Sequence, residues 1–325
     1  MFLMRFDMRA PDCSPASHAE LYAAALEMAA WGEANGCLAV VLSEHHASPD
    51  GYLPSPLTLA AAIAGRTTAL PIQVAAVLLP FYEPIRLAED MAVLDLISGG
   101  RVSYVVGIGY RDEELAMFGV ERRGRGALVE RTIDVLREAW TGEPFDLDGR
   151  RVHVTPKPAT VGGPVLMMGG RTAAAAKRAA RCGLGFYAQT SDAALAAAYR
   201  AACEERGAEP GSCMIPPAGT VTSAFVADDV DEAWERIGPY LLHDARLYTS
   251  WLSGAAAAVT TAATSVDDLR AERGAYRIFT VDEAVEYLRA HAVLVTQPLC
   301  GGLPPELAWR SLQLIVEKVI PAARS

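Results

Sequence analysis

Short apolar segments that predict strands alternate with longer segments at helical spacing along nearly the whole chain, and this alternation constrains the fold most strongly. The strand candidates are residues 2–8, 37–44, 71–80, 101–109, 164–170, 184–189, 219–227 and 292–298. Each is short and continuously apolar, as expected for strands buried on both faces of a parallel sheet. A helical segment follows each candidate, which makes eight strand–helix units.

Eight such units predict an α/β fold, a (β/α)8 TIM-type barrel with excursions after strand 4 and before the last helices. The first excursion is a polar hairpin at 142–158, and the second is a weakly patterned stretch at 246–278. We therefore expect one barrel domain over 1–325, with a substrate-lid insertion at 246–278. A doubly wound sheet is the alternative, but the G-x-G at Gly107 and Gly109 lacks the third glycine of a dinucleotide fingerprint.

Composition excludes several classes of partner. The 325 residues carry a net charge of −10 and have no Lys/Arg block, so nucleic acid and acidic membranes are poor partners. No window of the length needed to span a membrane is free of charge. The six cysteines are scattered without a C-x-x-C pair, which indicates reduced thiols in a cytoplasmic protein.

Ionisable residues follow the second strand candidate. Glu44, His45 and His46 stand where LAVVL ends and a Gly/Pro/Ser-rich loop begins. Active sites of TIM barrels lie at the C-terminal ends of the strands, so these residues would face the mouth of the barrel. Neighbouring side chains on an extended chain point opposite ways, so one histidine at most would act as a general base or ligand contact. The alternative is a loop that its polar side chains merely order.

The segment MMGGRTAAAAKRAAR has the features of a phosphate site. Gly169 and Gly170 allow close approach to the backbone, and Arg171 adds a planar donor fork. Thr172 is a natural N-cap, and the helix that it opens presents free N–H groups. An ordinary strand–turn–helix with a threonine cap is the alternative.

Other strand ends carry weaker signals. Pro80, Phe81 and Tyr82 follow the third strand; Gly109, Tyr110 and Arg111 follow the fourth; Gln189, Thr190 and Gln297 follow later ones. No other histidine stands at a strand end, so a metal site would depend on Asp112 and Glu113, and we expect none. The chain has no G-x-S-x-G elbow and no P-loop.

With these residues placed, the chain resembles the bacterial luciferase-like flavin monooxygenases over about residues 1–240 and 280–322. The resemblance rests on the order and spacing of VLSEHHASPDGYLPSPLTLAAAIAGRTT, VAAVLLPFYEPIRLAEDMAVLDLISGGRV, GIGYRDEELAMFGV, WTGEPFDLDGRRVHVTPKP and PVLMMGGRTAAAAKRAARCG. It implies a TIM-type barrel that binds reduced FMN, with the phosphate between the loops after strands 4 and 5.

The resemblance also assigns roles to residues. The catalytic histidine falls on His45, next to Glu44, and a non-proline cis peptide under the flavin ring falls at Ala75–Ala76. The phosphate-binding hydroxyl falls on Thr172, with Gly169, Gly170 and Arg171 beside it. Gly109, Tyr110 and Arg111 supply the loop after strand 4.

Two departures from the family pattern bear on the cofactor. The family pattern G-x-G-R-G-Y-R is shortened here to GIGYR, so its first arginine is missing, and Arg111 is the candidate substitute. A second hydroxyl, one turn into the phosphate helix, is replaced by Ala175. A related branch of the family uses a deazaflavin coenzyme for hydride transfer without oxygen.

The resemblance therefore implies a two-component FMN-dependent monooxygenase that takes reduced flavin from a separate reductase and oxidises a small, apolar substrate with O2. Trp251 and Leu252 indicate the apolar substrate. A deazaflavin-dependent oxidoreductase and a non-catalytic flavin-binding or partner subunit stay open as alternatives, and a zinc-dependent barrel hydrolase is a distant fourth. The resemblance also implies a homodimer, because dimers are common in the family. The helices after strands 2 and 3 are apolar enough to pack on a partner, and equally apolar enough to pack on the barrel.

Overall fold

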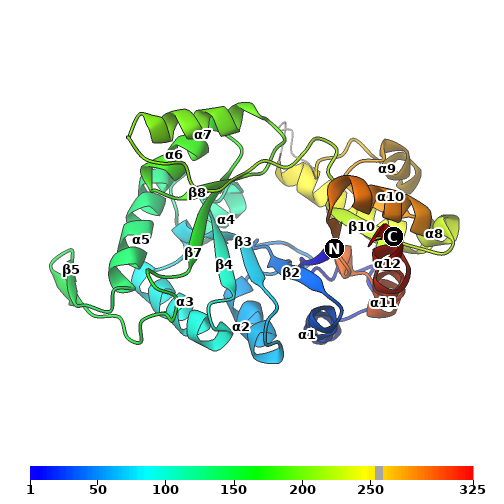
Figure 1. Ribbon diagram of the computed structural model, residues 1–325, viewed down its shortest axis with the longest axis horizontal. Coiled ribbons are helices and arrows are strands. Elements are labelled where there is room, and N and C mark those ends of the chain that lie inside the picture. Colours follow the sequence, from blue (N-terminus) through cyan, green and yellow to red (C-terminus); the bar gives the residue numbers. More distant parts are fainter. Residues whose placement is uncertain (253–258, 325) are drawn as a thin grey trace. The chain divides into compact units, whose positions relative to one another are not determined.

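Strands and helices alternate along the chain in the computed structural model, which describes residues 1–252 and 259–324 (Figure 1). By their internal contacts these residues form two compact units. The first consists of Met1–Val41, Ser48–Pro54 and Pro217–Ser325, and the second of Leu42–Ala47 and Ser55–Pro216.

The first unit contains a parallel sheet. Its strands lie in the order β11-β10-β12-β1-β2, with β10 paired in parallel to both β11 and β12, and β12 to β1. The bounds are β1 Phe2–Phe6, β2 Cys37–Leu42, β10 Ser223–Val226, β11 Tyr276–Phe279 and β12 Leu294–Thr296. All four residues of β10 are buried, which agrees with a strand covered on both faces.

Helices of the first unit start at side chains that cap them. Ser17, Ser265 and Thr280 form capping boxes at α1, α9 and α10, with an acidic residue three positions later in each. The helices are α1 His18–Ala34, α8 Val230–Trp251, α9 Val266–Glu272, α10 Val281–His291, α11 Pro305–Leu314, η3 Ile315–Val319 and α12 Ile320–Arg324, with a short turn η2 at Cys300–Gly302.

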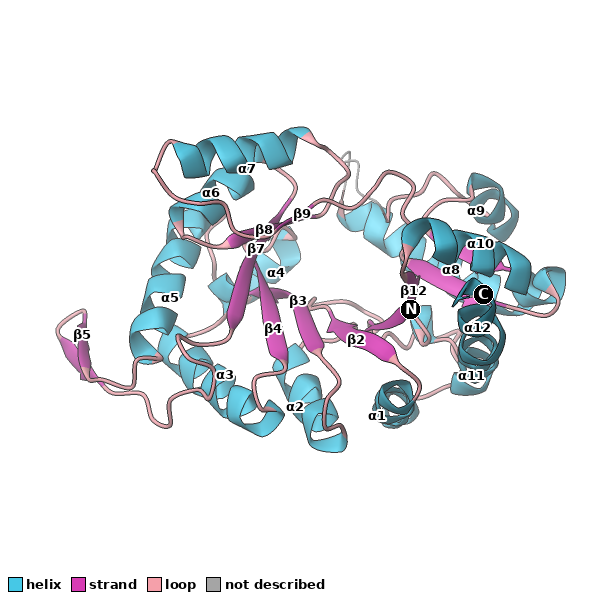
Figure 2. Ribbon diagram, viewed as in Figure 1, coloured by secondary structure: helices cyan, strands magenta, loops and turns pink. Residues whose placement is uncertain are grey.

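The second unit has its own parallel run of strands, in the order β3-β4-β7-β8-β9. The strands are β3 Ile72–Leu78, β4 Val102–Gly107, β7 Val165–Gly170, β8 Gly185–Ala188 and β9 Cys213–Met214. The helices are α2 Pro56–Arg66, η1 Leu79–Phe81, α3 Pro84–Ser98, α4 Asp112–Met117, α5 Arg125–Ala139, α6 Ala173–Arg181 and α7 Ala194–Glu204. Figure 2 shows α2, α3 and α5 along one side of β3, β4 and β7.

All eight expected strands are present, and so is the polar hairpin, as β5 Phe145–Leu147 paired antiparallel with β6 Arg150–Val152. The elements α4, β9, α9 and β11 were not predicted; they are six, two, seven and four residues long. Such short elements have no room for a periodic pattern. The expected insertion at 246–278 contains the end of α8, all of α9 and most of β11, while its residues 253–258 lie outside the described part.

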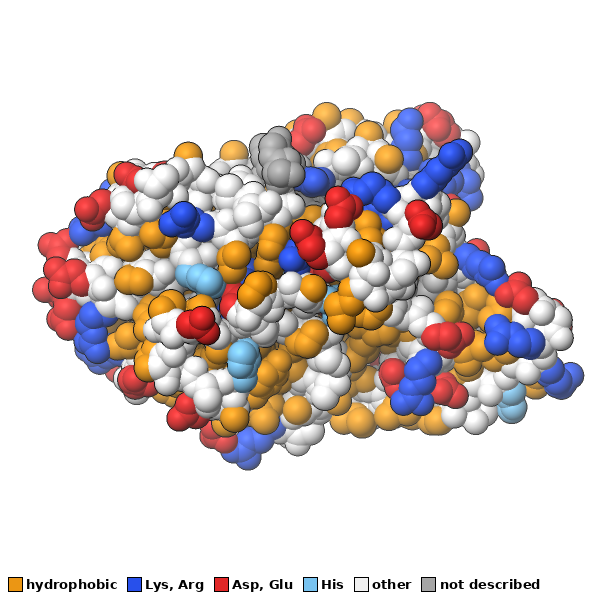
Figure 3. All heavy atoms as spheres, turned by 180° about the vertical axis from the view of Figure 1, so that it is seen from behind, with side chains coloured by type: hydrophobic (Ala, Val, Ile, Leu, Met, Phe, Trp, Pro, Cys, Tyr) orange, Lys and Arg blue, Asp and Glu red, His pale blue; other side chains and the backbone are white. Residues whose placement is uncertain are grey.

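The hydrophobicity of the described helices and the charges on the surface agree with the expectations from composition. None of these helices is both long enough and apolar enough to cross a membrane. On the face drawn in Figure 3, acidic and basic side chains are interspersed, and no large patch of a single sign gathers there.

Candidate functional site

Glu44, His45 and His46 follow β2 and are all buried in the second unit, with exposed fractions of 2%, 6% and 8%. Burying three ionisable side chains in a row is costly unless each finds a partner. The two imidazoles do find partners, and they find different ones, as expected for neighbours on an extended chain.

His45 is held by a glutamate from α4. Its Nδ1 lies 2.8 Å from Glu114 Oε1, and the same oxygen accepts the backbone N–H of His46 at 2.9 Å and Arg111 Nη1 at 3.3 Å. Burial alone would raise the pKa of Glu114, but the hydrogen bonds from His45 and His46 and the Arg111 charge hold that pKa below its usual value. With Glu114 ionised, Nδ1 of His45 is the protonated nitrogen. Nε2 then faces the Tyr110 hydroxyl, at 3.3 Å.

His46 has a different environment. Its Nε2 lies 2.8 Å from Glu44 Oε1, and its ring packs edge-on against Phe81 and Phe118 at 5.5 and 4.7 Å between centroids. Glu44 also accepts the Tyr82 hydroxyl at 2.9 Å and the Leu78 N–H at 2.8 Å, and its burial raises its pKa. Glu44, expected to bind a cofactor, thus ties the end of β2 to the end of β3.

The two expected phosphate loops follow neighbouring strands, since β4 pairs in parallel with β7. Thr172 caps α6 as predicted, accepting the Ala175 N–H at 3.3 Å. Arg171 Nη1 is buried and has no hydrogen-bond partner among the described residues. A buried, unsatisfied guanidinium nitrogen beside the free N–H groups of a helix start fits a bound anion, such as the phosphate of a flavin. The glycines have a packing role too, because a Cβ on Gly170 would lie 2.3 Å from that of Ala175.

Arg125, at the start of α5, is a candidate that the sequence analysis missed. Its Nη1 donates to the carbonyl of Gly109 in the loop after β4, and its Nε donates to the Arg122 carbonyl at 2.9 Å. Burial and the neighbouring Arg122 charge lower its pKa. No carboxylate pairs with Arg125 within the described ranges, whereas Arg111, the expected substitute in this loop, is engaged by the His46 carbonyl at 2.6 Å.

Strands β3 and β4 approach each other closely beside these loops. The Ala75–Ala76 peptide bond is cis, as the resemblance implied, and the pairing register shifts between Ala75 and Val77. Gly107 leaves room for this arrangement, because a Cβ there would lie 3.1 Å from Ala76 Cβ and 2.9 Å from Leu78 Cδ2. Ala75 and Ala76 are both partly exposed, so their small side chains form an accessible surface on β3.

Gln297 belongs to the first unit, where it binds Ser223 at 2.7 Å and Asp7 at 2.9 Å. Near it, Asp7, Asp244 and Cys300 form the one group of three metal-ligating side chains in the described part of the chain. Arg9 pairs with Asp244 there at 2.9 Å, so this carboxylate already has a cationic partner. The histidines after β2 do not belong to this group.

Comparison with known proteins identifies the family. The family model described as "Luciferase-like monooxygenase" matches residues 4–294. An uncharacterized protein y4vJ of Sinorhizobium fredii is 30% identical over 145 residues, which are 45% of this chain and 41% of that protein. An alkanal monooxygenase alpha chain of Photorhabdus luminescens is 29% identical over 150 residues, 45% of this chain and 42% of its own length. The matched region thus spans less than half the length of these curated relatives.

Solved structures match almost the entire chain. The monooxygenase RslO1 from Streptomyces bottropensis has a TM-score of 0.78 at 23% identity, with 98% of each chain covered. The oxygenating constituent of 3,6-diketocamphane monooxygenase from Pseudomonas putida, in complex with FMN, has a TM-score of 0.73 at 19% identity, covering 99% and 98%. An F420-dependent secondary alcohol dehydrogenase has a TM-score of 0.67 at 17% identity, with both chains fully covered. These likenesses confirm the predicted TIM-type barrel fold, and with the family match they show that the chain belongs to the luciferase-like monooxygenase family.

Proposed function

We propose that the protein is the oxygenating component of a two-component flavin monooxygenase, which uses reduced FMN and O2 to oxidise a small, apolar organic substrate. The observation that carries the proposal is the buried Glu114–His45 pair with Nε2 of His45 directed at Tyr110. Family membership and the FMN complex of a solved relative support it.

In this proposal, ionised Glu114 orients His45 and stabilises its charged form, so that Nε2 can accept or return a proton. Tyr110 extends the hydrogen bond of Nε2 toward the loop after β4. The buried state of His45, Arg111 and Glu114 keeps bulk water from this pair. Bound reduced flavin would supply the electrons for oxygen activation.

The proposed flavin site uses residues from both loops of the second unit. Arg171, Thr172 and the N–H groups at the start of α6 would hold the phosphate, with Arg125 replacing the arginine missing from the loop after β4. Arg125 is attached to the loop after β4 through Gly109, because the arginine donates a hydrogen bond to the carbonyl of that glycine. Ala75 and Ala76 would lie under the flavin ring.

Oxygen uptake tests the proposed activity. Wild-type protein, supplied with reduced FMN by a separate flavin reductase, is screened with small apolar substrates for product formed per oxygen consumed. Product that depends on both reduced FMN and oxygen, and that His45→Ala abolishes, supports a monooxygenase. Oxygen consumption that yields only hydrogen peroxide with every substrate class contradicts it.

A deazaflavin-dependent hydride transfer is the second candidate. The F420-dependent secondary alcohol dehydrogenase among the solved structures, whose fold matches over both full chains, supports it. This candidate predicts tight binding of the deazaflavin coenzyme and turnover of an alcohol or similar substrate in the absence of oxygen.

The third candidate is a non-catalytic flavin-binding or partner subunit. It predicts that His45→Ala leaves every measurable activity unchanged, while flavin binding persists. We also propose that the start of the expected insertion, up to Leu252, forms part of the substrate wall. In support, the Trp251 ring lies 5.5 Å from the Tyr248 ring between centroids, and the Arg9 guanidinium lies 4.6 Å from the Trp251 centroid.

A further inference from the structure

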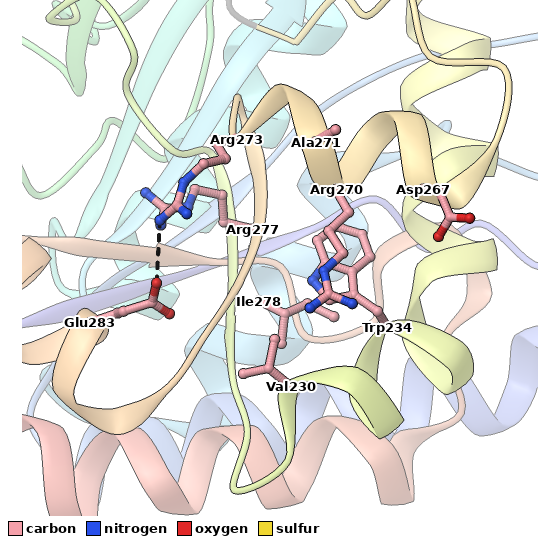
Figure 4. Close-up of a pocket in the computed structure, with 9 residues that line it drawn as sticks. All are labelled: Val230, Trp234, Asp267, Arg270, Ala271, Arg273, Arg277, Ile278 and Glu283. Carbon is pink, nitrogen blue, oxygen red and sulfur yellow. Dashed lines mark hydrogen bonds and ion pairs between the residues drawn. The ribbon is translucent and has the colours of Figure 1, made fainter.

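An open cleft of about 430 Å³ lies in the first unit, among residues that the proposed reaction does not use. It is lined by Val230 and Trp234 of α8, Asp267, Arg270 and Ala271 of α9, Arg273 after that helix, Arg277 and Ile278 of β11, and Glu283 of α10. Figure 4 shows three arginine side chains extending into this space: Arg270 from α9, Arg273 from the turn after that helix, and Arg277 from β11. The volume is within the range of small-ligand pockets.

Two of the three guanidinium groups form ion pairs with carboxylates, and the third has no such pair in the part of the chain that the structure describes. Arg270 pairs with Asp231 at 2.5 Å, and Arg273 pairs with Glu283 at 3.2 Å. Arg277 lies over the Phe279 ring, 4.1 Å from its centroid, and no carboxylate or carbonyl binds it within the described ranges. Burial and then the neighbouring Arg273 charge lower the pKa of Arg277. One partly buried cation with free donors therefore faces the cleft.

The remaining walls are apolar. Trp234 and Ile278 are each only 5% exposed and form packed surfaces, and Val230 and Ala271 add small apolar side chains. A single cation without an ion-pair partner matches a single negative charge better than the double charge of a phosphate. A guanidinium presents its donors in a fork that matches a carboxylate.

We infer that this cleft binds a small organic carboxylate with a flat apolar body, with Arg277 as the residue that recognises the carboxylate. Arg273 adds positive charge, and Trp234 and Ile278 contact the apolar body. This ligand site shares no residue with the proposed flavin site, whose residues all belong to the second unit.

Benzoate binding to the full-length protein tests the inference, with calorimetry as the readout. We expect saturable binding to wild type, a weakening of about tenfold or more in Arg277→Gln, as for loss of a charged hydrogen bond, and no change in Arg236→Gln. Arg236 is the matched control because it is a paired, exposed arginine on α8 outside the cleft. Inorganic phosphate, which lacks the apolar body, should bind more weakly than benzoate.

A second variant covers the case in which Arg277→Gln fails to fold. Ala271→Glu changes an exposed position of the cleft and places a competing carboxylate beside the arginines, so it should also abolish benzoate binding. Absence of binding to wild type, equal loss in Arg236→Gln, or unchanged binding in Ala271→Glu would overturn the inference. Reduced-FMN binding, measured on the same variants, should stay unchanged, which separates this site from the proposed function.

Discussion

At the scale of single residues, the site depends on two hydrogen bonds: His45 binds Glu114, and the adjacent His46 binds Glu44. Glu114 has a lowered pKa and Glu44 a raised one, although both are buried. Each carboxylate accepts three hydrogen bonds, but one donor of Glu114 is the Arg111 guanidinium, whose charge helps to lower the pKa. Among the described residues no arginine donates to Glu44, and the effect of its burial exceeds that of its hydrogen bonds. Environments that push two carboxyl groups apart in pKa are typical of acid–base sites.

The first prediction concerns this division of roles. His45→Ala should lower the rate of flavin-dependent turnover by about 10²- to 10⁴-fold, the usual contribution of a general acid–base residue. Glu114→Gln should lower it by a smaller factor and displace the pH profile, because the neutral amide no longer stabilises protonated His45. Steady-state rates across pH check both.

The outcome that would contradict these roles is a Glu114→Gln variant with an unchanged pH profile. His46→Ala serves as a comparison, since His46 packs between two phenylalanines and binds Glu44. This variant should have a lower free energy of unfolding, and the pH profile of its turnover should stay close to that of wild type.

A second residue-scale prediction concerns Asp7 in the first unit. Burial, with a further contribution from Asp244, raises its pKa from 3.8 to about 7. The folded state therefore holds this proton more tightly than the unfolded chain. The stabilisation is complete below about pH 4 and is lost as the pH rises through about 7, by an amount on the order of a few kcal/mol.

Denaturant unfolding of wild type and Asp7→Asn between pH 4 and pH 8 measures this effect. The asparagine variant does not titrate, so the free energy of unfolding of wild type should fall relative to the variant as the pH rises. A difference that is constant over this pH range would show that Asp7 does not take up a proton there.

At the scale of elements, the start of α6 combines a structural and a binding role. Thr172 caps the helix, and removal of such a cap costs about 0.5–2 kcal/mol. Thr172→Ala should therefore lower the free energy of unfolding by about 1 kcal/mol and also weaken reduced-FMN binding. Thr172→Ser keeps the hydroxyl and should restore both. If serine restores stability but not binding, the hydroxyl is only a cap.

Prediction from sequence worked best for elements with a long or continuous pattern. The eight strands, the hairpin and the Thr172 cap could all be predicted, because each depends on a local signal. The four-residue β11 could not, because its identity as a strand depends on pairing with β10, more than fifty residues earlier. Glu114 was missed for a related reason. Asp112 and Glu113 precede it directly, and only the burial of one face of α4 distinguishes the three.

Arg125 shows the same limit for the flavin site. Its contact with Gly109 joins two segments sixteen residues apart and requires the folded loop, so no local motif marks it. The cis bond at Ala75–Ala76 was expected only through the family resemblance, because nothing in two alanines signals it.

At the scale of the whole molecule, α3 presents apolar side chains to solvent. Val93, Leu96 and Ile97 are 43%, 44% and 50% exposed and lie within two turns of the helix. Exposed apolar residues gathered on one helix are typical of protein–protein contacts. We propose a homodimer that buries this part of α3.

Light scattering tests the homodimer. The double variant Val93→Lys/Ile97→Lys should convert a dimer to a folded monomer, because burying two lysines in an apolar contact is costly. Met214→Lys, on an exposed residue of β9, is the control and should leave the dimer intact. A monomeric wild type, or a double variant that stays dimeric, contradicts the proposal.

The most direct test of the whole account is an anaerobic titration of the protein with reduced FMN and, separately, with the deazaflavin coenzyme. The account predicts that reduced FMN binds more tightly, and that Arg171→Ala and Arg125→Ala each weaken it by about tenfold or more, as for a charged phosphate contact. Arg131→Ala, at an exposed arginine paired with Asp148, should have no effect. Tighter binding of the deazaflavin would contradict the FMN assignment, and reduced-FMN binding unaffected by Arg171→Ala and Arg125→Ala would contradict the proposed phosphate site.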